Sequence, residues 1–217
     1  MVIRNRRLIR SSTLMLLLVS CVLFVNDAFS QSPPPLREQV PVVDDHLVKE
    51  PTAGVRIGKL RVLFDSTKMA DIGVELHNVI TTHERTPYGG FTWLCFTVVE
   101  ARASSRVWVE SDDEMGGSDQ VVTGIYTASL SENVKPTSQC PALPGGGGTV
   151  TFDSDLKLGS SIEDLRRALG SAPSTNQGWW RYLNDDSGSA HANLGELDVK
   201  LQNGIVVAVQ AARLETY

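Results

Sequence analysis

The chain has 217 residues, and its 25 acidic side chains outnumber its 20 basic ones, which gives a net charge of −5. An acidic surface repels nucleic-acid phosphates and anionic membrane surfaces, so this balance argues against both as partners. The length is enough for one domain or for two small ones.

Residues 1–30 have the layout of a secretory signal peptide. Four arginines precede an apolar run over 14–25, and Ala28-Phe29-Ser30 ends the leader with small residues at its first and third positions. The run is too short to span a bilayer comfortably. We expect cleavage after Ser30, which leaves 16 basic and 24 acidic side chains, a net charge of −8, and a periplasmic or secreted protein.

A second interpretation of this leader stays open. Residues 18–21, LVSC, resemble a bacterial lipobox, in which Cys21 would carry a lipid anchor and become the new terminus. However, apolar residues 22–25 follow Cys21, whereas a lipoprotein normally continues into a polar tether. We expect soluble export and keep the lipid anchor at Cys21 as the alternative.

Two proline-rich stretches divide the rest of the chain. Residues 31–54 contain five prolines and no hydrophobic periodicity, which predicts an extended tether. Residues 131–148 contain three prolines and end in four glycines, which predicts a linker. No Gly-Lys-Ser/Thr follows these glycines, so they do not form a phosphate-binding loop. The expected structural units are residues 55–130 and 149–217.

Both units begin with the pattern of a short amphipathic helix. Apolar residues stand at i, i+3 and i+7 within 66–76 and again within 159–169, and the two stretches align without a gap. Each predicted helix opens with serine or threonine, which are preferred at helix N-termini. In the second, an N-terminal serine with Glu163 or Asp164 predicts a capping box, and Gly170 predicts the end of the helix.

Three strand patterns follow each predicted helix: an aromatic segment, an alternating segment and a β-branched segment. They cover 91–96, 106–110 and 121–128 in the first unit, and 178–183, 197–201 and 205–212 in the second. Asn203-Gly204 predicts a tight hairpin turn. The sequence therefore predicts an α+β fold of two tandem repeats, each a short helical segment packed on a three- to four-stranded antiparallel sheet.

The second unit resembles a known repeat family. The sequence LKLGSSIEDLRRALGSAP, followed by GWWRYL and ELDVKLQNGIVVAVQ, is similar to the SmpA/OmlA outer-membrane lipoprotein repeat. The tandem arrangement resembles that of the β-lactamase inhibitor protein. In the first unit the resemblance is weaker, because Leu76-His77-Asn78 replaces the Leu-Gly-x-Pro helix exit. The resemblance implies a sheet that serves as a surface for binding other proteins at the cell envelope.

Cys95 and Cys140 are the two cysteines that follow the leader. An even number of cysteines in an exported chain predicts a disulfide, with two separate buried thiols as the alternative. The enclosed loop of about 45 residues gives an entropic stabilisation of roughly 4 kcal/mol at best.

The histidines and carboxylates show no pattern of catalysis or metal binding. His46 lies in the tether, His77 at a helix end and His191 among small residues, and His83-Glu84 lacks the second histidine of a zinc protease. The acidic stretches 112–114 and 184–188 lack the ligand register of a calcium loop. With both cysteines bridged, no soft metal site remains. We expect no enzyme, no cofactor and no metal.

The tryptophans are the candidate binding residues. If Val107 and Val109 face the helix, Trp108 faces away from it, and an exposed aromatic on a sheet is a typical anchor for a protein partner. We name Trp108 first, then Trp93 and Trp179, with filling of the core as the alternative for each of them. The alternation over 91–96 leaves open which of its two sides is buried. The working hypothesis is an exported protein-binding module, of an inhibitor or scaffold type; the alternatives are an outer-membrane assembly lipoprotein and an enzyme with an unrecognised site.

Overall fold

The computed structural model describes part of the chain. It covers residue 34 and residues 52–76, 82–86, 89–100, 103–116, 119–130, 134–145, 148–171, 174–185 and 192–216. The predicted signal peptide, Cys21, and His46, His77 and His191 lie outside the described residues. No helix in the described part is long and apolar enough to cross a membrane.

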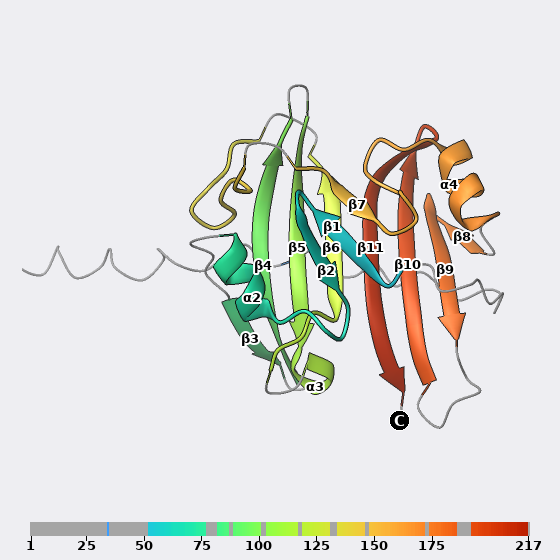
Figure 1. The fold of residues 1–217 in the computed structure, drawn as a ribbon. Coiled ribbons are helices and arrows are strands. Elements are labelled where there is room, and N and C mark those ends of the chain that lie inside the picture. The colour runs from blue at the N-terminus through green and yellow to red at the C-terminus, as the bar shows by residue number, and fades with distance from the viewer. Residues whose placement is uncertain are drawn as a thin grey trace, which may run out of the picture.

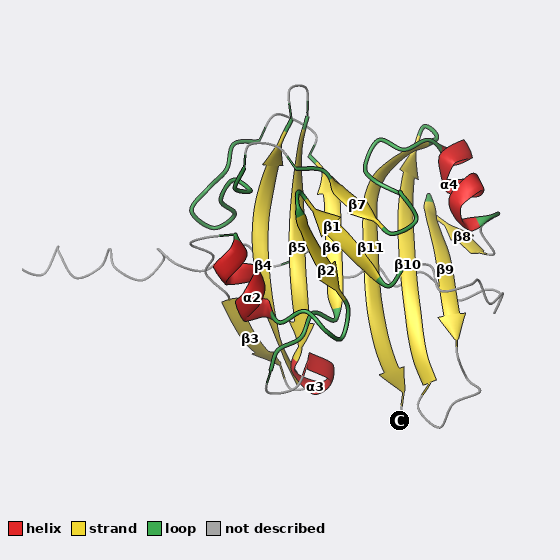
Figure 2. Ribbon diagram, in the orientation of Figure 1, coloured by secondary structure: helices red, strands yellow, loops and turns green. Residues whose placement is uncertain are grey.

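The described residues form an α+β fold, as the sequence predicts (Figures 1 and 2). The first half holds β1 (Gly54–Ile57), β2 (Leu60–Leu63), α2 (Met69–Glu75), β3 (Thr82–Thr86), β4 (Gly89–Val99), β5 (Ser104–Asp112), α3 (Asp113–Gly116) and β6 (Gly124–Ser129). The second holds β7 (Val150–Phe152), α4 (Ile162–Leu169), β8 (Ser174–Asn176), β9 (Trp179–Asp185), β10 (Ala192–Gln202) and β11 (Ile205–Thr216). The predicted helices correspond to α2 and α4, and the predicted strands to β4, β5, β6, β9, β10 and β11.

The main sheet differs from the prediction of two separate sheets. Its eight strands run β3-β4-β5-β6-β11-β10-β9-β8, so each half contributes four strands to one continuous antiparallel sheet. The halves join where β6 pairs with β11, from Ala208 opposite Ala128 to Ala212 opposite Gly124. Two separate sheets would leave both of these β-branched strands with unpaired backbone groups at an edge, and the pairing satisfies both.

A second, three-stranded sheet has the order β2-β1-β7, and the sequence pattern did not predict it. Its strands are only three or four residues long, and β7 begins two residues after the glycine run. β7 comes from the second half of the chain and pairs with β1 of the first. The small sheet therefore ties the two halves together a second time.

The two helices start against the main sheet through matching hydrogen bonds. In the first half, the Met69 amide donates to the Gln120 carbonyl at 3.0 Å and the Val122 amide to the Thr67 carbonyl at 2.8 Å. In the second, the Ile162 amide donates to the Gly204 carbonyl and the Val206 amide to the Ser160 carbonyl, both at 2.9 Å. In each half, the turn before the last strand thus holds the start of the helix.

The hydrophobic core lies between one face of the main sheet and a layer formed by α2, α4 and the small sheet (Figure 1). Leu94 and Phe96 of β4 and Leu197 of β10 point into it, with Ile72 of α2 and Leu165 of α4 opposite, and each is fully buried. The alternation along the strands then directs the neighbouring side chains to the other face of the sheet.

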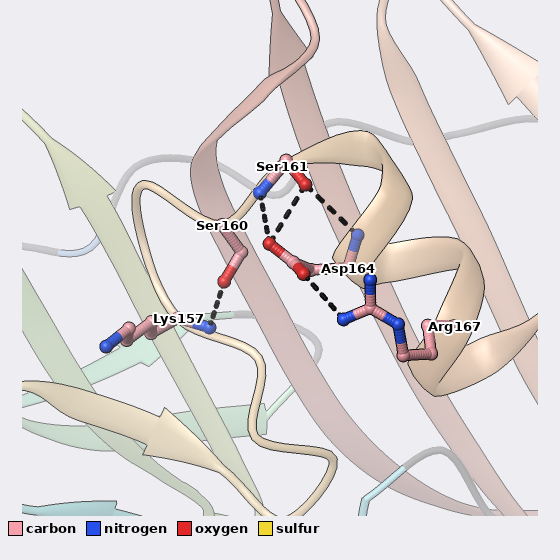
Figure 3. A network of polar contacts seen from close by, with 5 residues as sticks. All are labelled: Lys157, Ser160, Ser161, Asp164 and Arg167. Atoms are coloured by element: carbon pink, nitrogen blue, oxygen red, sulfur yellow. Dashed lines mark hydrogen bonds and ion pairs between the residues drawn. The ribbon is translucent and has the colours of Figure 1, made fainter.

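The start of α4 has the predicted capping box, formed by Ser161 and Asp164 (Figure 3). The Asp164 amide donates to Ser161 Oγ, and the Ser161 amide donates to Asp164 Oδ2, each at 3.1 Å. These hydrogen bonds, and after them the contact with Arg167, lower the pKa of Asp164. Gly170 ends the helix with a φ of 83°, which suits glycine. By contrast, α2 has no side-chain cap at Lys68.

Candidate protein-binding face

The face of the main sheet that points away from the core is the candidate site, and we call it the outer face. Strand pairing arranges its side chains in three rows. The central row is Cys95, Trp108, Tyr126, Gln210, Asp198 and Arg181; the cationic row is Thr97, Arg106, Ala128, Ala208, Lys200 and Trp179; the acidic row is Trp93, Glu110, Gly124, Ala212, Glu196 and Leu183. Each row crosses β4, β5, β6, β11, β10 and β9 in that order.

An aromatic cluster surrounds a disulfide on the first half of this face. Cys95 and Cys140 are bonded, with their Cα atoms 4.8 Å apart, as the sequence predicts. Both are fully buried beside Trp93 and Trp108. The Trp108 ring also lies against Tyr126, with ring centroids 5.5 Å apart. The first half of the outer face is therefore mainly apolar.

The predicted linker is fastened to the edge of β4 beside this cluster. The Thr97 amide donates to the Pro141 carbonyl at 2.7 Å, and the Leu143 amide donates to the Thr97 carbonyl at 2.9 Å. Thr97 Oγ1 also donates to the Cys140 carbonyl at 2.8 Å. The disulfide and these bonds make the segment around Cys140 a short extension of the sheet.

All three candidate tryptophans lie on the outer face, but none is an exposed anchor. Trp93, Trp108 and Trp179 are 2, 4 and 4% exposed. Val107 and Val109 do face the core, so the predicted side for Trp108 agrees with the structure, and the expected exposure does not. Trp93 and Trp108 pack against the disulfide, and Trp179 packs against Ala208. Sequence alternation assigns a side chain to a face, but it does not say what lies against that face.

In the second half, an ion network lies at the position that corresponds to the disulfide of the first half. Arg181 donates from Nε and Nη2 to the two carboxylate oxygens of Asp198, each at 2.9 Å, and its Nη2 lies 2.5 Å from Glu196 Oε1. The side chains of Arg181, Asp198 and Glu196 are 13, 1 and 9% exposed. Burial lowers the pKa of Arg181, but the hydrogen bond to Asp198 and the charge of Glu196 outweigh it, so this pKa is raised. The guanidinium stays charged between two carboxylates.

The other two rows carry opposite charges on either side of small residues. In the cationic row, Arg106 and Lys200 flank Ala128 and Ala208, and the Lys200 ammonium lies 5.2 Å from the ring centroid of Trp179. Arg106 Nε is buried and has no hydrogen-bond partner among the described residues. In the acidic row, Glu110 and Glu196 flank Gly124 and Ala212. In these two rows the middle strands, β6 and β11, carry only small residues, whereas in the central row they carry Tyr126 and Gln210.

A smaller polar cluster, which no sequence pattern predicts, lies at the edge of the sheet. His83 Nδ1 is 3.0 Å from Thr92 Oγ1 and His83 Nε2 is 3.6 Å from Asp113 Oδ2, while Gln120 donates to the same threonine oxygen at 3.2 Å. The order carboxylate, imidazole, hydroxyl resembles a catalytic relay. Thr92 is buried and shares its hydroxyl with Gln120, however, so a substrate has no access to it.

Among the described residues, no three His, Cys, Asp or Glu side chains converge to hold a metal ion. Comparison with protein-family models, with curated proteins and with solved structures finds no match for this chain. The outer face is therefore interpreted from its own chemistry.

Proposed function

We propose that this chain is an exported, non-catalytic protein-binding module of the bacterial envelope or extracellular space, and that it acts by occupying or holding another protein. The proposal combines the leader sequence and the buried disulfide, which suits an oxidising compartment, with the chemistry of the outer face. The resemblance to the SmpA/OmlA repeat, whose sheet serves for protein binding, favours the same function.

We also propose that the fold arose from two copies of one unit. The matching hydrogen bonds at Met69 and Ile162 support this, as does the mirrored strand order on either side of the β6–β11 junction. A duplicated unit accounts for the width of the outer face, because each copy alone supplies four strands. It also accounts for the different chemistry of the halves, since Cys95 and Arg181 occupy equivalent central-row positions.

One observation carries the assignment: the outer face gathers tryptophan, tyrosine and arginine side chains on a rigid sheet whose opposite face is filled by the core. These three residue types dominate the energetic centres of protein interfaces. Tyr126, Arg181 and Lys200 retain partial exposure, so they are the residues that we expect a partner to contact first. Two buried tryptophans contact this set: Trp108 packs against Tyr126, and the Trp179 ring lies under the Lys200 ammonium.

The test is crosslinking and co-purification of the exported protein, followed by mass spectrometry of what it captures. Lys200→Glu and Tyr126→Ala should each reduce capture of the same partner, while both variants keep the melting temperature within a few degrees of the parent. Lys157→Glu is the matched control, because Lys157 is an exposed cation near α4 and far from the three rows in the strand register. If the Lys200→Glu and Lys157→Glu variants captured the partner equally well, the outer face would be excluded as the binding surface.

A further inference from the structure

The two edges of the main sheet are protected against strand addition in different ways. An edge strand presents unpaired N–H and C=O groups, to which a strand of another molecule can add. At one edge, β8 is only three residues long. At the other, β3 covers β4 as far as Trp93 and carries exposed charged side chains at Glu84 and Arg85. Short length and charge both discourage strand addition, but neither protects the part of β4 that continues beyond β3.

The sequence of this part of β4 favours pairing with a copy of itself. Residues 92–99, TWLCFTVV, contain no charge, proline or glycine, and all except Leu94 and Cys95 are β-branched or aromatic. Uncharged segments with such high β-propensity self-associate when their edge is open. Another device must therefore cover this edge in the folded chain.

The linker covers this edge of β4 through an isolated bridge. Thr97 and Ala142 form this bridge, and it is parallel. Because backbone groups alternate in direction along a strand, those of Cys95 and Val99 point to the same edge as those of Thr97. An isolated bridge provides little cooperative pairing, so the disulfide is the strongest link between the linker and β4.

We infer that the disulfide keeps the edge of β4 covered, and that the reduced chain pairs at this edge with a second copy of itself. A dithiol reductant supplies two electrons and two protons: the bond between the sulfur atoms of Cys95 and Cys140 breaks, two thiols form, and the reductant closes to a cyclic disulfide. The linker is then held by the hydrogen bonds at Thr97 and by Leu143, whose side chain is buried in the core.

A second copy of β4 matches this edge over a longer stretch than the linker does. In an antiparallel pair centred on Thr97 of both copies, Cys95 lies opposite Val99 of the other copy, and each of these residues enters the ladder. The pairing brings no like charges together, because residues 92–99 contain none. Disulfides persist in oxidising compartments and are kept reduced in the cytosol, so the compartment of the chain would set its association state.

Sedimentation velocity over a range of protein concentrations tests the inference with the exported chain. We expect the double variant Cys95→Ser/Cys140→Ser to self-associate at least about tenfold more tightly than the oxidised parent. Val99→Lys in the double variant places a charge on the edge and should reverse most of this gain. Val74→Lys in the same background is the matched control, because Val74 lies on α2 and the two valines, Val99 and Val74, are 49 and 74% exposed.

Amide hydrogen exchange at Thr97 measures the cover directly, at a concentration too low for association. Exchange should be at least about tenfold faster in the double variant than in the parent. Parent-like exchange at Thr97 would mean that the linker stays in place without the disulfide, and it would overturn the inference. Equal association of the double variant and the parent, or an equal effect of the two lysine substitutions, would overturn it as well.

Both measurements require the double variant in its folded state. Loss of a disulfide lowers stability, so a variant that melts below the assay temperature is measured in sucrose, which favours the folded state. Neither measurement involves another protein, so the inference and the proposed function can fail independently.

Discussion

The ion network of the second half gives the most demanding test of the structure. Arg181→Met removes the guanidinium and keeps a long side chain of similar volume. It leaves the carboxylates of Asp198 and Glu196 facing each other at 1 and 9% exposure, without the cation that they share. Removing one partner of a buried ion pair leaves an uncompensated charge, so we expect a loss of about 3–5 kcal/mol in the free energy of unfolding.

Urea denaturation at neutral pH measures this loss. With a slope of about 2–3 kcal/mol per molar urea, the midpoint should fall by about 1–2 M while the slope stays unchanged. Arg167→Met is the control, because its ion pair with Asp164 has side chains 77 and 51% exposed, and it should move the midpoint far less.

A second substitution tests the cause. Arg181→Met combined with Asp198→Leu removes both members of the closest pair and should be more stable than Arg181→Met alone, since apolar replacement of a buried ion pair is often neutral. A loss below about 1 kcal/mol for Arg181→Met would mean that the carboxylates are solvated and not buried. A double variant less stable than the single one would mean that the packing of Asp198, and not its charge, matters.

Three further predictions follow from the described contacts. Replacing Cys95 and Cys140 by serine should lower the free energy of unfolding by up to about 4 kcal/mol, measured in urea, and the difference from the parent should vanish under full reduction. Ser161→Ala removes the cap of α4 and should lower the free energy of unfolding by about 1 kcal/mol, measured in a thermal melt. Thr67 does not cap a helix, so Thr67→Ala should leave α4 unaffected. Burial raises the pKa of Tyr182 from 10.0 to about 12, ahead of an opposing effect of Arg166. Because the unfolded chain loses this proton first, stability should fall as pH rises from 10 to 12, and Tyr182→Phe should make that fall shallower.

The elements whose sequence carries a strong local signal were predictable. The capping box at Ser161 and the glycine at 170 set the ends of α4 through bonds within a few residues. Asn203 and Gly204 both have positive φ, 53° and 77°, which is the requirement of the tight turn between β10 and β11. The edge strands β3 and β8 were missed, because their polar sequences, THERT and STN, acquire a strand conformation only by pairing with β4 and β9.

In the candidate site, too, features with a local sequence signal could be predicted and features that depend on strand pairing could not. Its disulfide could be predicted from cysteine count and export, and the side on which Trp108 lies from alternation, whereas the sides of Trp93 and Trp179 could not be assigned. The bond from Arg181 to Asp198 spans 17 residues and depends on the register of β9 against β10, which no local pattern specifies.

The sequence by itself determined helices α2 and α4, the six long strands and the side of the sheet on which Trp108 lies, because periodicity and turn chemistry act between near neighbours. Only the tertiary structure decided that the two halves share one sheet, that the linker is fastened to β4, and that Trp108 is buried. Those outcomes depend on pairing between residues such as Tyr126 and Gln210, which lie far apart in the chain. Such contacts form only when the whole chain satisfies its backbone groups and apolar surfaces together.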